Sequence, residues 1–160
     1  MKEIRFKGFT LIELLVVITI IGILATLLMS NYIGVRARAR DAQRKSDLRQ
    51  IQTALEQYRS DNNATPYPST LPSCGSSFTN GSGTTYMQKI PCDPLSTASS
   101  PLPYYYFFTD STHYAIASCL ENGNDKDVVT AVPSWWPPAS TWPPSGLSCS
   151  SAYYYVSSNP

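Results

Sequence analysis

The sequence has few of the residues on which enzyme active sites and metal centres usually depend. It has a single histidine, His113, which falls in a predicted strand, and none of its four cysteines has the CxxC spacing of a zinc site. It has no glycine-rich phosphate loop, and no pair of carboxylates marks an obvious cleft. We therefore expect a protein that is not an enzyme and that binds no cofactor.

Proline is missing from the first 65 residues, although the chain has 13 prolines in all. Within this part, residues 9–29 form an apolar run that contains one charge, Glu13. As an α-helix this run would be roughly 30 Å long, which is the thickness of the hydrocarbon core of a bilayer. Lys2, Arg5 and Lys7 precede it. The positive-inside rule therefore predicts a single span with the N-terminus in the cytoplasm.

Two ordinary explanations of this run remain as alternatives. One is a cleaved secretory signal peptide, and the other is a plain signal anchor. A signal peptide has an apolar region of about 7–15 residues that ends near a small-x-small cleavage site. This run is longer, has Glu13 in its first turn and lacks a clear site of that kind. A membrane-embedded segment that stays part of the precursor is therefore the better prediction.

The string KGFTLIE at residues 7–13 resembles the signal of type IV prepilins and type II secretion pseudopilins. The resemblance covers about the first 60 residues. It implies that a prepilin peptidase cuts between Gly8 and Phe9 and methylates the new N-terminus at Phe9. It also implies a homopolymer formed through the N-terminal helices, and assembly by an inner-membrane platform protein and an ATPase.

Glu13 is costly in a span, because a centrally placed acidic residue costs ~3 kcal/mol on insertion scales and less near the end. An amine about 4 Å away, at an effective dielectric constant of ~20, returns a Coulomb energy of similar size. The resemblance implies that Glu13 meets the N-terminal amine of a neighbouring subunit and so sets the register of assembly. Phe9 and Glu13 share a helix face, so pairing within one chain is the alternative.

The helix is expected to continue beyond the membrane to about Asp61. Leu48, Ile51, Leu55 and Tyr58 recur at steps of three and four, which predicts one apolar stripe. The expected organisation is a leader at 1–8, a transmembrane and filament-core helix at 9–31, an amphipathic continuation at 32–62 and an extracytoplasmic head at 63–160.

Charge is unevenly distributed in a chain whose net charge is only +1. Residues 36–59 have seven basic and three acidic residues, whereas residues 62–160 have two and five. The basic cluster at 36–45 predicts a solvated or lipid-facing collar, or ion pairs with carboxylates of neighbouring heads. Phosphate binding, as in DNA uptake, is the alternative.

The head is expected to be a small antiparallel sheet packed on the helix stripe, which gives an α+β fold of the type IV pilin kind. Residues 63–103 read as a connecting loop. Residues 104–109 and 113–120 form the clearest hairpin signal, and residues 127–132 and 152–157 are further strand candidates. The tyrosine runs at 104–106 and 153–155 are expected to pack on the sheet. The proline-rich segment 133–146, which includes Trp135, Trp136 and Trp142, is expected to be a surface loop.

Four dispersed cysteines beyond an export signal indicate two disulfides formed in an oxidising compartment. Three connectivities are possible. We favour Cys74–Cys92 and Cys119–Cys149, because sequential pairing closes local loops.

The segment after residue 90 resembles, more loosely, the heads of major pseudopilins, in which an acidic loop can hold calcium. The possible oxygen ligands here are Glu121, Asn122, Asn124, Asp125 and Asp127. A solvated acidic turn is the expectation, and a calcium site is the alternative.

The sequence thus predicts a filament subunit that is first a single-pass inner-membrane precursor and then part of a periplasmic or extracellular filament. The alternatives are a major pseudopilin that moves secreted proteins, and a pilin for DNA uptake or adhesion.

Overall fold

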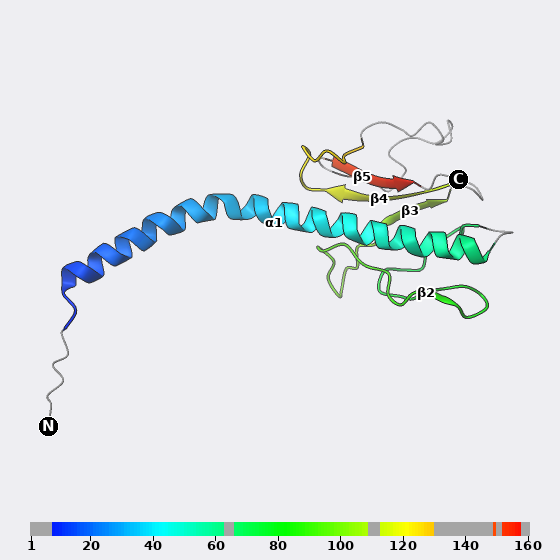
Figure 1. Ribbon diagram of the computed structural model, residues 1–160, viewed down its shortest axis with the longest axis horizontal. Helices are drawn as coiled ribbons and strands as arrows, with labels where there is room; N and C mark the ends of the chain where they lie inside the picture. The colour runs from blue at the N-terminus through cyan, green and yellow to red at the C-terminus, as the bar shows by residue number, and fades with distance from the viewer. Residues whose placement is uncertain (1–7, 63–65, 109–112, 130–148, 150–151, 158–160) are drawn as a thin grey trace, which may run out of the picture. The chain divides into compact units, whose positions relative to one another are not determined.

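The computed structural model describes residues 8–62, 66–108, 113–129, 149 and 152–157. The chain divides into two compact units, one up to Arg36 and one from Ala37 onward. A single helix, α1 (Leu11–Asp61), belongs to both (Figure 1). The predicted continuous helix is therefore confirmed, and it begins two residues later than expected. At its end the Asn62 side chain donates to the Tyr58 carbonyl over 2.8 Å, which satisfies a terminal acceptor.

A three-stranded antiparallel sheet is the larger of the two sheets in the second unit. It contains β3 (Tyr105–Phe108), β4 (Tyr114–Leu120) and β5 (Ala152–Ser157) in the order β3-β4-β5, with β4 central (Figure 1). In the hairpin, Phe108 pairs with Tyr114 and Tyr105 pairs with Ala117. The predicted hairpin and the predicted last strand are both confirmed. His113 lies one residue before β4.

The core lies between the sheet and the second half of α1. Leu48, Ile51 and Leu55 are almost completely buried, and they belong to one cluster with alternate residues of β4, among them Tyr114 and Ile116. Each such apolar side chain stabilises the fold by about 1.5–3 kcal/mol on burial. The helix stripe predicted from sequence therefore packs on the sheet in one α+β core.

Two tyrosines of the first predicted run also pack where expected. Tyr104 and Tyr106 lie against the core cluster, and the Tyr106 hydroxyl donates to the Pro68 carbonyl over 2.6 Å. The side chains of the second run, Tyr153–Tyr155, and the tryptophan segment 133–146 lie outside what the structure describes.

The connecting loop contains a short hairpin that the sequence analysis did not predict. Its strands are β1 (Phe78–Thr79) and β2 (Thr85–Met87), joined by a turn in which Gly83 has φ 89°. The Asn80 side chain closes the turn by accepting the Thr84 amide over 2.8 Å. Strands this short give no periodic signal, so they cannot be recognised by alternation.

The predicted strand at 127–132 is wrong in its described part. Residues up to Val129 form a turn and irregular backbone, and the Val128 amide donates to the Asp125 carbonyl over 3.1 Å. The physical reason is an ion pair, because Asp125 and Asp127 both bind the ammonium of Lys45. Residues 130–132 lie outside the described residues.

Candidate functional site

The helix start is fixed by a capping box between Thr10 and Glu13. Glu13 Oε2 accepts the Thr10 amide over 2.8 Å and the Thr10 hydroxyl over 2.9 Å. In return, Thr10 Oγ1 accepts the Glu13 amide over 3.3 Å. This reciprocal pattern satisfies donors that a helix N-terminus otherwise leaves without partners. In the uncut chain, then, the Glu13 carboxylate bonds to Thr10.

The predicted cleavage site lies immediately before this cap. Gly8 and Phe9 are exposed and outside the helix, and the Phe9 side chain is 84% exposed. A Cβ atom built on Gly8 would meet nothing within 4 Å. The fold of the chain itself therefore does not require glycine at this position, so any requirement for it must come from a molecule that binds here.

The first unit exposes its apolar side chains on every side of the helix. From Phe9 to Met29 the large apolar side chains are 47–88% exposed. The hydroxyls of Thr19 and Thr26 donate to carbonyls three residues earlier, over 2.8 and 2.7 Å. Residues 11–29 form a helix long and apolar enough to cross a membrane. Such a surface needs lipid or copies of itself to cover it.

Three cations of the basic cluster bind carboxylates of their own chain, which the sequence analysis did not predict. Arg40, Arg44 and Lys45 form ion pairs within their own chain, with carboxylates that lie 49–82 residues away in the sequence, apart from one partner on the same helix. Arg36 lies over the Tyr32 ring at 4.6 Å. Arg36 and Arg38 are exposed, as expected of a solvated collar. The other three cations correct that expectation, because their pairs lie within their own chain.

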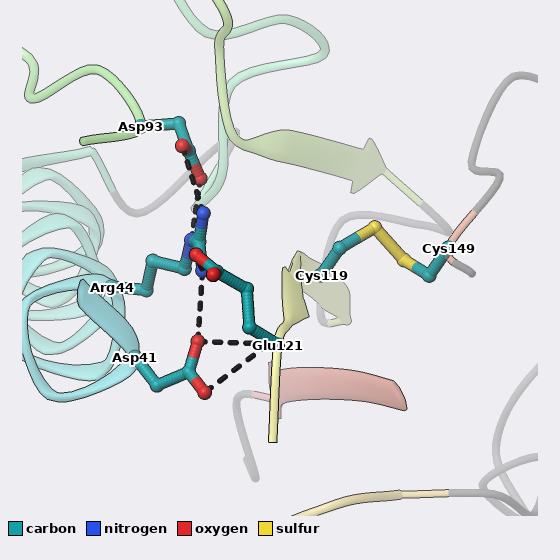
Figure 2. The surroundings of a disulfide bond; sticks show 6 residues. All are labelled: Asp41, Arg44, Asp93, Cys119, Glu121 and Cys149. Carbon is teal, nitrogen blue, oxygen red and sulfur yellow. Dashed lines mark hydrogen bonds and ion pairs between the residues drawn. A yellow bond between two sulfur atoms is a disulfide. The ribbon is translucent and has the colours of Figure 1, made fainter. Parts of the chain in front are cut away.

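Arg44 is the centre of this network (Figure 2). Its side chain is only 3% exposed, and its guanidinium contacts three carboxylates. It donates to Asp93 over 2.6 and 3.1 Å, to Asp41 over 2.8 Å and to Glu121 over 2.9 Å. Burial opposes the charge on Arg44, but the hydrogen bonds to these carboxylates outweigh it and raise the pKa of the guanidinium.

Asp41 joins the helix directly to the end of β4. Its carboxylate, 1% exposed as a residue, accepts the backbone amide of Glu121 over 2.9 Å (Figure 2). It also accepts the backbone amide of Asn122 over 2.9 Å. Cys119, two residues before Glu121, forms a disulfide with Cys149. A second disulfide joins Cys74 to Cys92, so the structure has the sequential pairing.

This network predicts a loss of stability in acid. The hydrogen bond from Arg40, followed by that from Arg44, lowers the pKa of Glu121 from its ordinary value of 4.5 to about 2. Because the folded pKa lies below the unfolded one, the stabilisation is complete above pH 4.5 and disappears as the pH falls towards 2. We expect a loss of at most about 3 kcal/mol, reduced by solvent screening.

The measurement is the free energy of unfolding of the full chain in detergent between pH 7 and pH 3. Glu121→Gln should flatten this dependence. Burial raises the pKa of Asp47, which by itself makes acid less damaging. The assignment of this acid sensitivity to Glu121 would be wrong if the free energy of unfolding of the wild type fell with pH no more steeply than that of Glu121→Gln.

Comparison with known proteins places the chain in a family. Residues 5–29 match the prokaryotic N-terminal methylation motif. The chain is also 34% identical over 141 residues to type II secretion system core protein G of Pseudomonas aeruginosa, a match that covers 79% of this chain and 94% of the relative. The chain belongs to the pilin and pseudopilin family. In this family member, the match to core protein G reaches well beyond the N-terminal helix.

Other relatives of this pilin-family chain match over shorter stretches. Core protein G of Pectobacterium carotovorum is 35% identical over 102 residues, which is 58% of this chain and 64% of the relative. The type IV major pilin protein PilA of Myxococcus xanthus is 42% identical over 57 residues, which is 36% of this chain and 26% of PilA. The match thus spans less than two thirds of each of these two relatives. No solved structure gives a significant match.

Two functional features of this pilin were absent from the sequence analysis. Thr10 was missed although TLIE is the capping-box pattern, Thr-x-x-Glu, before an apolar run. Arg44 was assigned only to a basic cluster. No local signal identifies it, because two of its three carboxylate partners are 49 and 77 residues away.

Proposed function

We propose that the chain is a prepilin that is cut after Gly8, methylated at Phe9 and polymerised through its N-terminal helices. The observation that carries this proposal is the helix from Leu11 to Met29, whose large apolar side chains are exposed all round. Before assembly, lipid would cover this surface, and in a filament other copies of the same helix would cover it. The precursor would span the inner membrane once, with its N-terminus in the cytoplasm.

Among filaments, a pseudopilus of a type II secretion system is the better candidate. The match to core protein G of Pseudomonas aeruginosa extends over 141 residues and therefore includes the head, whereas the match to PilA extends over 57 residues. The partners of this subunit would be a prepilin peptidase, an inner-membrane platform protein and an assembly ATPase.

A pilus for adhesion or DNA uptake is the second candidate, and one observation weighs against the DNA role. Three cations of the basic cluster, Arg40, Arg44 and Lys45, already bind carboxylates of their own chain. Deletion of the gene should therefore block secretion of exoproteins and leave DNA uptake unchanged. Loss of uptake with normal secretion would favour the second candidate.

Mass spectrometry of the mature protein tests the processing step. We expect a chain that begins at methylated Phe9. Gly8→Leu should abolish cleavage, because the side chain meets nothing in the pilin itself but would obstruct an extended backbone in a protease cleft. Gly22→Ala, at a second glycine with open space around it, is the matched control and should be cut normally.

Two results would contradict this proposal. One is a mature chain that keeps Met1, and the other is a cut within the apolar run near Ala25, as for an ordinary secretory signal.

A further inference from the structure

The acidic loop 121–127 has the composition of a calcium site, but its oxygens already have partners. Calcium in proteins takes six to eight oxygen ligands at 2.3–2.6 Å. In this loop the Glu121 carboxylate binds Arg40 and Arg44, and Asn122 Oδ1 accepts the Asn124 amide over 3.3 Å. Within the described residues, no group of three or more acidic, histidine or cysteine side chains is placed to hold a metal. The loop therefore does not fit a calcium ion.

A cation nevertheless binds the end of the loop, and it comes from the helix. Lys45 Nζ lies 2.7 Å from Asp127 Oδ2 and also binds Asp125 Oδ1. Asp125 Oδ1 in turn accepts the Asp127 amide over 3.0 Å, which closes the turn around the ammonium. The Lys45 side chain is 14% exposed and that of Asp125 is 19% exposed, so solvent screens this pair only in part.

The two ends of the loop are attached to the same helix. Asp41 accepts the amides at the start of the loop, and Lys45, one helical turn later, binds the carboxylates at its end. An ammonium has three donors and no acceptor, so two carboxylates match its bonding capacity well. The arrangement holds the loop to α1 without any further ligand.

We propose that Lys45 is a built-in cation that replaces a divalent metal in the loop 121–127, so that the head folds and remains stable without calcium. Lys45 binds the two carboxylates that a metal would need and fixes the loop to the helix. The protonation state of Asp125 is consistent with this role, because the hydrogen bond from Lys45 lowers the pKa of Asp125 and keeps its carboxylate ionised. This inference concerns the head alone and does not depend on the proposed function.

The test is thermal unfolding of the full chain in detergent, followed by near-UV circular dichroism of the head tyrosines. Each protein is measured with millimolar Ca²⁺ and with EDTA. We expect the wild-type melting temperature to be the same in both conditions. Lys45→Met keeps the aliphatic stem but leaves two carboxylates unpaired, and it should lower the melting temperature by about 5 °C in EDTA.

Lys89→Met is the matched control, because it makes the same chemical change at an exposed position outside the network. Its melting temperature should equal that of the wild type in both conditions. The proposal is wrong if Ca²⁺ raises the wild-type melting temperature by several degrees, or if Lys45→Met melts with the wild type. Should Lys45→Met fail to fold, the loss supports the role of the ammonium, and the wild-type response to Ca²⁺ still decides whether a metal is needed.

Discussion

Replacement of Arg44 by methionine is expected to destabilise the head by about 3–5 kcal/mol, because it leaves buried carboxylates without their counterion. Asp41 and Asp93 would lose the cation with which they form ion pairs, and Glu121 would keep Arg40 as its one cationic partner among the described residues. A domain of this size has only about 5–15 kcal/mol of stability in total. The variant should therefore unfold at a much lower urea concentration, as measured by near-UV circular dichroism of the full chain in detergent.

Arg49→Met is the matched control for this experiment. Arg49 lies on the same helix, is exposed and has no ion pair that the described residues reveal. Its loss should change the free energy of unfolding by less than about 0.5 kcal/mol. Arg44→Lys keeps the charge but cannot reproduce the forked geometry, so its stability should be intermediate. Equal effects of Arg44→Met and Arg49→Met would show that the buried network does not stabilise the head.

Glu13→Ala is expected to abolish filaments when no wild-type subunit is present, while membrane insertion and cleavage continue. The substitution removes the only charge in the span, so insertion becomes easier, by up to ~3 kcal/mol for a central position. It also removes the carboxylate that would meet the amine of a neighbouring Phe9 during assembly. Filaments are measured by electron microscopy and by shearing, and processing by mass spectrometry.

The capping box makes a sharper comparison possible. Glu13→Gln changes the box from Thr-x-x-Glu to Thr-x-x-Gln, which still caps a helix, and so removes only the charge. Thr10→Val keeps the charge but removes the hydroxyl that bonds to Glu13, at a cost of about 1 kcal/mol in helix capping. If Glu13 sets the register through its charge, filaments should be lost in Glu13→Gln and retained in Thr10→Val. The reverse result would show that its role in assembly is to cap the helix.

Local patterns were sufficient to predict the long helix and the three strands of the main sheet, but not the short hairpin β1-β2. The apolar stripe of Leu48, Ile51 and Leu55 has a helical period, and the strand before residues 109–112 consists of aromatic residues. The helical period also indicated which face of the helix meets the sheet, since that face must be buried. The ends of the helix were correct to within two residues, because an apolar run begins it and an Asn-rich segment ends it.

The ion-pair network could not be predicted in this way. Lys45 and Asp127 are 82 residues apart, and no period relates a position on a helix to a position in a loop beyond the sheet. The charged residues of the basic cluster were therefore predicted to face solvent, lipid or neighbouring subunits. The same omission caused the error at residues 127–132, because the carboxylates that bind Lys45 hold that segment in a turn.

The shared helix α1 determines where heads can be exchanged between such proteins. A chimera joined after residue 62, where the sequence changes from stem to head, would replace the sheet. It would keep Leu48, Ile51, Arg44 and Lys45 from the original chain. The new sheet would then face a helix surface shaped for another partner. A junction between Arg36 and Ala37, where the two compact units separate, would transfer the sheet together with its own half of the core and its own counterions.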